Sequence, residues 1–106
     1  MTYIIKWSEK SKNDFIEIVD YLLINWGNYS AKKFKNKVFK SIELILKFPS
    51  IYPITEYRKN LRRCIVVKQV SLYYQVKEND KEIYLVRFID NRRATFKISK
   101  SLYEAE

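Results

Sequence analysis

Residues 8–49 read SEKSKNDFIEIVDYLLINWGNYSAKKFKNKVFKSIELILKFP and contain two consecutive helical patterns. Apolar residues recur at steps of three and four in both halves, which is the period of an amphipathic helix. The first set is Phe15, Ile18, Val19, Leu22, Leu23 and Trp26. The second set is Ala31, Phe34, Val38, Ile42 and Ile45. This stretch therefore predicts two helices, each with one face turned toward a core.

Local signals place the ends of these helices. Ser8 stands where its hydroxyl can cap a first helix, and Gly27, the only glycine in the chain, follows the last apolar position. Ser30 is the candidate cap of the second helix, and Pro49 disfavours helix at Phe48. We therefore expect helices over about 9–26 and from about 31 to 47. The short connection 27–29 predicts an antiparallel helix hairpin.

Outside the hairpin the pattern becomes extended. Residues 3–7 form a short strand-like run, and three further runs cover 61–68, 70–77 and 82–89, with 78–81 as a hairpin connection. The predicted fold is α+β with the order β-α-α-β-β-β, in which the helix hairpin packs on one face of a mostly antiparallel four-stranded sheet. A single domain is expected over 1–106. Both faces of the 82–89 run are largely apolar, so its pattern does not assign an inward face.

Composition excludes several classes of protein. The chain has 21 Lys and Arg against 12 Asp and Glu, a net charge of +9, no histidine and one cysteine. Zinc fingers, histidine-based catalytic triads and disulfide scaffolds are thereby excluded, and we expect no metal, no cofactor and no small-molecule ligand. The unpaired Cys64 and the lack of a targeting or membrane segment predict a cytoplasmic protein without membrane contact.

The excess of positive charge indicates an acidic partner. We expect the sheet face opposite the hairpin to be open and basic, apart from whatever part a short helix or strand in the polar tail covers. Five lysines on the second helix, at positions 32, 33, 35, 37 and 40, either bind nucleic acid or form an ordinary solvated face. Cys64 is interpreted as a packing residue, because no histidine is present to activate its thiol. Tyr73 and Tyr74 could stack on bases, but tyrosine in a strand is more often a packing residue, and we interpret both in that way.

Several strings, in this order, resemble those of the RelE/ParE superfamily of bacterial type II toxin–antitoxin toxins. They are 8–11 (SEKS), 18–22 (IVDYL), 25–27 (NWG), 48–49 (FP), 60–63 (NLRR), 72–76 (LYYQV) and 87–93 (RFIDNRR). The resemblance implies a growth-inhibiting toxin, of plasmid-stabilisation or chromosomal origin. It also implies a cognate, usually acidic antitoxin protein that neutralises the toxin.

The superfamily contains two activities. RelE-like members are metal-independent endonucleases that cut mRNA on the ribosome, and ParE-like members poison DNA gyrase. RelE-like nucleases carry basic residues on the second and third strands and beyond the fourth. Here Arg62 and either Arg92 or Arg93 match such positions, while Cys64 and Ser71 replace two of the cations. This partial match favours the ParE-like branch. The alternatives are a RelE-like nuclease, a degenerate toxin, or a basic nucleic-acid-binding module without catalysis.

The candidate residues for binding the target or nucleic acid are Arg62, Arg63, Arg87, Arg92 and Arg93. If the protein is an enzyme, the resemblance makes Arg62, Arg92 and Arg93 the catalytic candidates. Arg62 and Arg63 are neighbours on one strand, so their side chains should point to opposite faces. Arg87 lies in an apolar strand, where it either faces the open side of the sheet or pairs with a carboxylate such as Asp90 or Glu56, and we favour the ion pair.

Overall fold

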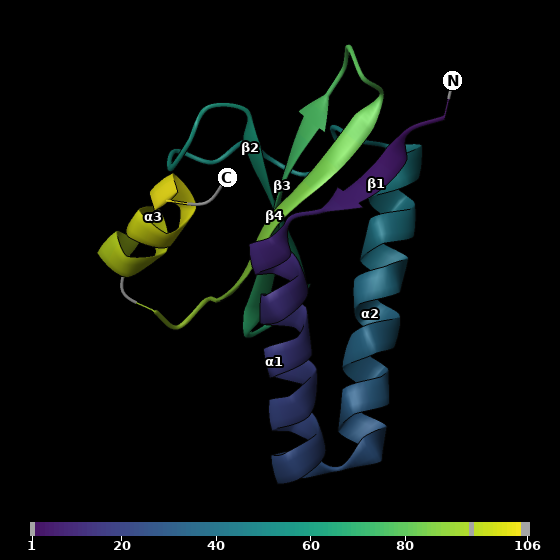
Figure 1. Cartoon of the computed structure of the whole chain (residues 1–106), viewed down its shortest axis with the longest axis vertical. Helices are drawn as coiled ribbons and strands as arrows, with labels where there is room; N and C mark the ends of the chain where they lie inside the picture. Colours follow the sequence, from purple (N-terminus) through teal and green to yellow (C-terminus); the bar gives the residue numbers. More distant parts are fainter. Residues whose placement is uncertain (1, 94, 105–106) are drawn as a thin grey trace.

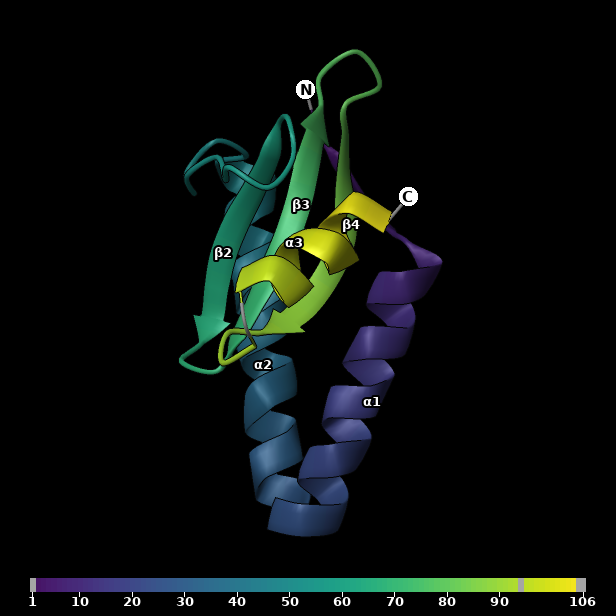
Figure 2. The same ribbon diagram turned by 90° about the vertical axis from the view of Figure 1, so that its left-hand side faces the viewer.

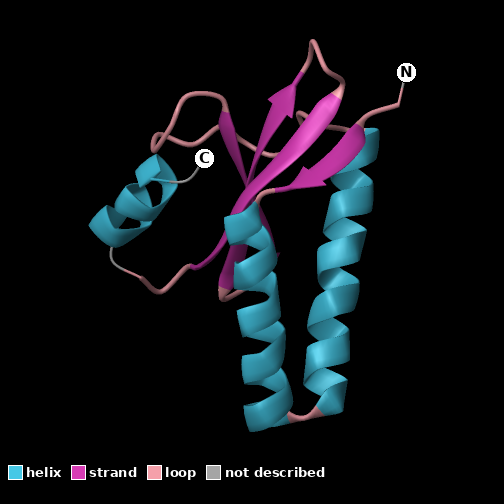
Figure 3. Cartoon of the chain, in the orientation of Figure 1, coloured by secondary structure: helices cyan, strands magenta, loops and turns pink. Residues whose placement is uncertain are grey.

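The predicted α+β fold is confirmed by a computed structural model that describes residues 2–93 and 95–104. A hairpin of two long helices packs against one face of a sheet, and a short C-terminal helix lies on the other face (Figures 1 and 3). The elements in chain order are β1 (Ile4–Trp7), α1 (Glu9–Trp26), α2 (Asn28–Lys47), β2 (Leu61–Val67), β3 (Val70–Lys77), β4 (Glu82–Asp90) and α3 (Thr95–Glu104). None of the described helices is long and apolar enough to cross a membrane.

The sheet has the strand order β1-β4-β3-β2. β1 runs parallel to β4, and the other two pairs are antiparallel. On the hairpin side, the apolar stripe of α2 packs with Leu72, Tyr74 and Leu85 in one core cluster. The partly buried Phe15 extends this cluster to α1 and lies 6.0 Å from Phe88, measured between ring centroids. The hairpin therefore packs against the sheet through buried apolar side chains, as the apolar stripes of the two helices predicted.

Ser8 caps α1 and also joins this helix to the sheet. Its Oγ accepts a hydrogen bond from the Ser11 amide at 3.0 Å, as predicted for an N-cap, and donates to the Val86 carbonyl at 2.8 Å. The side chain of Ser8 is buried. The first turn of α1 is therefore fixed against β4. This anchor sets the positions of the polar side chains of α1 relative to β4.

The connection between the helices is shorter than predicted. α2 begins at Asn28, so Gly27 alone separates the two helices. The expected cap at Ser30 is wrong, because Ser30 lies inside α2 and its hydroxyl donates to the Trp26 carbonyl at 3.5 Å. Gly27 adopts φ 90° and ψ 179°, a region open almost only to glycine, and its amide donates to the Leu22 and Leu23 carbonyls. This one residue reverses the chain, so no longer loop is needed.

The second face of the sheet is covered, and the expectation of an open basic face is wrong. Figure 2 shows α3 crossing this face in front of β3 and β4. Ile98 and Leu102, one helical turn apart, complete a second buried cluster with Tyr73, Val86 and Ile89. Because Ile83, Leu85 and Phe88 face the hairpin cluster, β4 is buried on both sides. This double burial explains why its sequence pattern did not assign an inward face.

We expect Gly27→Ala to lower the free energy of unfolding by about 1–3 kcal/mol, because a Cβ disfavours the backbone angles of this residue. No atom lies within 4 Å of the added Cβ, so the loss would come from the backbone and not from a clash. Urea denaturation measures it. Ser30→Ala, three residues along, is the control and should change stability by less than about 0.5 kcal/mol. Equal stability of Gly27→Ala and the unmodified protein would contradict the role of this glycine.

Candidate functional site

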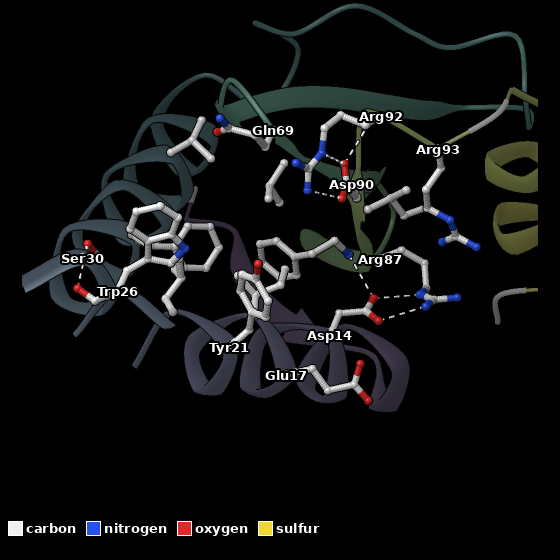
Figure 4. Close-up of a pocket in the computed structure, with 17 residues that line it drawn as sticks. Asp14, Glu17, Tyr21, Trp26, Ser30, Gln69, Arg87, Asp90, Arg92 and Arg93 are labelled. Carbon is white, nitrogen blue, oxygen red and sulfur yellow. Dashed lines mark hydrogen bonds and ion pairs between the residues drawn. The ribbon is translucent and has the colours of Figure 1, made fainter. Parts of the chain in front are cut away.

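A groove of about 750 Å³ lies between α1, the beginning of α2 and the C-terminal end of β4 (Figure 4). Its lining is apolar at Ile18, Leu22, Phe34, Val67 and Val70. Two aromatic side chains in the lining are largely exposed, Tyr21 at 59% and Trp26 at 69%. Six charged side chains complete it: Asp14, Glu17, Arg87, Asp90, Arg92 and Arg93. Three of the five candidate arginines are thus brought together in one groove.

Arg87 is held by a carboxylate of α1. Its Nε and Nη2 donate to the two oxygens of Asp14 at 2.7 and 2.8 Å, and the Phe88 amide donates to Asp14 Oδ2 at 3.1 Å. The hydrogen bonds with Asp14 raise the pKa of Arg87 above its ordinary value. The prediction of an ion pair is confirmed, but the predicted partners, Asp90 and Glu56, are wrong. The reason is the packing of α1 along β4, which brings Asp14 beside Arg87.

Asp90 instead holds Arg92. Its two oxygens accept from Arg92 Nε at 3.0 Å and Nη2 at 2.7 Å, and Oδ1 also accepts from the Arg92 amide at 2.8 Å. The hydrogen bond from Arg92 lowers the pKa of Asp90 below its ordinary value. Most of the Arg92 side chain remains in solvent, with 75% exposed. Arg92 therefore stays accessible to a partner in a fixed orientation.

Arg93 is exposed at the same rim. Within residues 2–93 and 95–104, no hydrogen bond or ion pair holds its guanidinium group. Its backbone amide donates to the Asp90 carbonyl at 3.2 Å, which places the residue in the turn that follows β4. Of the five candidate arginines, Arg93 therefore has the side chain with the greatest freedom to bind another molecule.

The side chains of Arg62 and Arg63 point to opposite sides of β2, and each donates hydrogen bonds that stabilise the fold. Arg62 Nη1 donates to the Tyr52 carbonyl at 2.7 Å and the Ser50 carbonyl at 3.3 Å, which ties the 48–60 loop to the strand. Arg63 donates to Ser71 Oγ at 2.9 Å and to Asn91 Oδ1 at 3.1 Å. The two side chains diverge, as expected for neighbours on a strand. Neither arginine lines the groove, but Arg63 is bonded through Asn91 to the turn after β4, whereas Arg62 is bonded to the 48–60 loop.

Two side chains that could take part in proton transfer, Cys64 and Tyr74, are buried and do not line the groove. Cys64 is fully buried, and burial raises the pKa of its thiol. Tyr74 is also fully buried, with a hydroxyl that donates to the Pro49 carbonyl, and burial raises its pKa to about 12. These residues pack, as the sequence predicted. Among the described residues no cluster of three or more His, Cys, Asp or Glu side chains could hold a metal ion.

Sequence reasoning missed Asp14, Ser71 and Asn91 as residues that build this site. Ser71 is fully buried and donates to Asn91 Oδ1 at 2.5 Å, and Asn91 in turn donates to the Lys68 carbonyl. This network fixes the turn that presents Arg92 and Arg93. No clear sequence signal marked this network, because Ser71 lies in a strand that also carries the polar residues Gln75 and Lys77, and its partner Asn91 is 20 residues away.

We expect Asp14→Asn to destabilise the protein by about 2–4 kcal/mol, because it leaves the largely buried Arg87 guanidinium without its countercharge. Only 12% of the Asp14 side chain and 19% of the Arg87 side chain is exposed. Urea denaturation measures the effect. Glu17→Gln removes an exposed carboxylate one turn further along α1 and should change stability by less than about 0.5 kcal/mol. Similar losses for the two variants would refute a specific role of the ion pair.

Comparisons with known proteins place this geometry in a family. A sequence model described as the ParE toxin of the type II toxin-antitoxin system, parDE, matches residues 5–95. No curated protein sequence was similar enough to count as a relative.

Solved structures share the fold. The structure titled chromosomal ParDE TA system from P. aeruginosa aligns with a TM-score of 0.71 at 19% identity, over 85% of this chain and 96% of the other. A metal-bound toxin from Helicobacter pylori gives 0.56 at 23% identity, over 86% and 96%. The isolated E. coli RelE toxin gives 0.59 at 13% identity, over 92% and 94%. Since the family model spans most of the sequence and the fold agrees, the chain belongs to the ParE toxin family and is the toxin component of a type II toxin–antitoxin system.

Proposed function

We propose that this toxin acts in the cytoplasm by inhibiting DNA gyrase and is neutralised by a cognate acidic antitoxin. Membership of the ParE family supports gyrase as the target, because the resemblance of the sequence to ParE-like toxins implies that activity. The main observation behind the proposal is that most of the candidate arginines are already hydrogen-bonded within the protein. Four of the five are bonded within the described chain, to carbonyl groups, to Ser71 and Asn91, or to carboxylates.

This arrangement argues against RNA cleavage. A ribonuclease without histidine needs several cations around the scissile phosphate, together with a group that moves protons. Cys64 and Ser71 stand at two positions where the resemblance expects cations, and both are buried. Removing one such electrostatic contact typically lowers the rate by about 10²–10³-fold. Two expected cations are missing, and Arg62 is held by carbonyl groups of a loop. The positive charge that remains is therefore too small for efficient RNA cleavage.

The groove has the composition of a protein-binding surface. Exposed tryptophan, tyrosine and arginine are the side chains that most often dominate protein–protein affinity, and Trp26, Tyr21, Arg92 and Arg93 meet here. We assign Arg92 and Arg93 to contact with the target. Arg62, Arg63 and Arg87 act on the target only by holding the fold in place.

The helix hairpin also exposes large apolar side chains that a monomer would bury, among them Ile24 at 83%. An amphipathic antitoxin segment laid along the hairpin would cover them, and acidic residues in that segment would match the net charge of +9. Such a segment would also cover the groove. Neutralisation then follows from competition for one surface.

We expect the purified toxin to inhibit supercoiling by DNA gyrase and to cause gyrase-dependent DNA breaks. In translation reactions with purified ribosomes it should leave mRNA intact, because the described residues lack a complete set of catalytic cations. A reaction without gyrase controls for contaminating nuclease. Codon-positioned cleavage of mRNA, with gyrase unaffected, would overturn the proposal in favour of the RelE-like activity.

We expect Arg93→Ala to raise the toxin concentration that half-inhibits gyrase by about tenfold, which corresponds to about 1.4 kcal/mol of binding free energy. Lys59→Ala is the matched control, since it removes one positive charge from an exposed position outside the groove. It should change the half-inhibiting concentration by less than about twofold. Equal effects of the two variants would mean that total charge and not the groove governs inhibition.

A further inference from the structure

From its start to Lys40 the outer face of α2 carries only positive charge, and the exposed Glu43 follows one turn later on the same face. Between residues 28 and 42 there are five lysines and no carboxylate. Four of them, Lys32, Lys33, Lys37 and Lys40, are exposed. With Tyr29 and Asn36 they line a shallow hollow of about 380 Å³. At 100° per residue these six positions form a stripe opposite the buried stripe of Ala31, Phe34, Val38, Ile42 and Ile45. The stripe, which we call the lysine face, therefore points directly away from the core.

This pattern differs from an ordinary solvated helix face. Helix α1 carries charges of both signs, with Lys10 and Lys12 in its first turn and the four carboxylates Glu9, Asp14, Glu17 and Asp20. In the described part of the chain, no ion pair involves a lysine of the lysine face. Like charges three and four residues apart, such as Lys33 and Lys37, repel each other and weaken a helix. The arrangement thus works against the stability of α2, which points to an external polyanion that neutralises it.

The dimensions and composition of the lysine face suit duplex DNA. From Tyr29 to Lys40 the helix rises about 17 Å, and a duplex presents about ten phosphate charges over the same length. Protein–protein interfaces are depleted in lysine, whereas protein–DNA interfaces are strongly positive and polar. The hairpin also projects beyond the end of the sheet, so that the beginning of α2 can approach a long polymer without interference from the strands (Figure 1).

We infer that the lysine face of α2 binds the phosphate backbone of double-stranded DNA, without sequence preference. The contact uses the ammonium groups of Lys32, Lys33, Lys37 and Lys40. It does not require gyrase to be the target, because the toxin alone makes it. If gyrase is the target, the same contact raises the toxin concentration along the DNA that gyrase holds.

The test is fluorescence anisotropy with a duplex of about 20 base pairs and random sequence, at several salt concentrations. The unmodified chain should bind with a Kd of roughly 1–100 μM near 0.15 M salt. Replacing the four lysines with glutamine should make the slope of log K against log salt less negative by about 3.6, since each phosphate contact contributes about −0.9. Between about 50 and 200 mM salt, those four contacts account for a fall in affinity of about 150-fold.

A matched variant carries glutamine at Lys59, Lys68, Lys97 and Lys100, which are exposed and lie outside the lysine face. Both variants lower the net charge of +9 by the same four units. The matched variant should lose less than about one unit of slope. A Lys→Arg version of the lysine face should keep the slope of the unmodified chain, and circular dichroism checks that each variant is helical.

Three results would overturn the inference. One is no DNA binding by the unmodified chain at about 50 mM salt. Another is equal loss of slope in the two glutamine variants, which would assign binding to total charge. The third is unchanged DNA binding by the lysine-face variant with loss of antitoxin binding, which would assign the face to an acidic protein. Gyrase inhibition, measured separately, is not needed for any of these outcomes, so the inference and the proposed target can fail independently.

Discussion

Burial of both faces of one small sheet is the constraint on which the rest of this structure depends. The helix hairpin covers one face and α3 covers the other, so β4 has apolar neighbours on both sides. Polar side chains near the sheet are accommodated where a strand ends or where a loop, a turn, a neighbouring strand or a helix supplies a partner. Arg87 meets this condition through Asp14 of α1, and Arg92 and Arg93 lie beyond the end of the strand. The position of the groove follows directly from this burial.

Most of the arginines in this toxin hold the fold and are not free to act on a ligand. Arg62 joins a loop to β2, Arg63 joins β2 to the turn after β4, and Arg87 joins β4 to α1. Each of these guanidinium groups satisfies acceptors that burial would otherwise leave without partners. A high count of cations is therefore a poor guide to catalytic capacity. Catalytic capacity depends on how many arginine side chains remain unbonded at one place. Among the described residues that number is small, which favours binding of a partner over cleavage of a phosphate ester.

The helix hairpin presents two chemically different surfaces. Toward the groove it offers apolar and aromatic side chains with charges of both signs, which suits a protein partner. From its start to Lys40, the outer side of α2 offers lysines as its only charged side chains, which suits a polyanion. Because the two surfaces lie on different sides of the same pair of helices, the proposed contacts with a protein and with DNA do not exclude each other.

The sequence by itself determined the existence of the two long helices, the four strands and the family. The cap at Ser8, the reversal at Gly27 and the end of α2 before Pro49 depend on residues within about one helical turn, so local pattern was sufficient. Only the tertiary structure decided that α3 covers the second face and that Arg87 pairs with Asp14, 73 residues away. Periodicity reports which side of an element is apolar. It does not report which distant element lies against that side, because that choice depends on the packing of the whole chain.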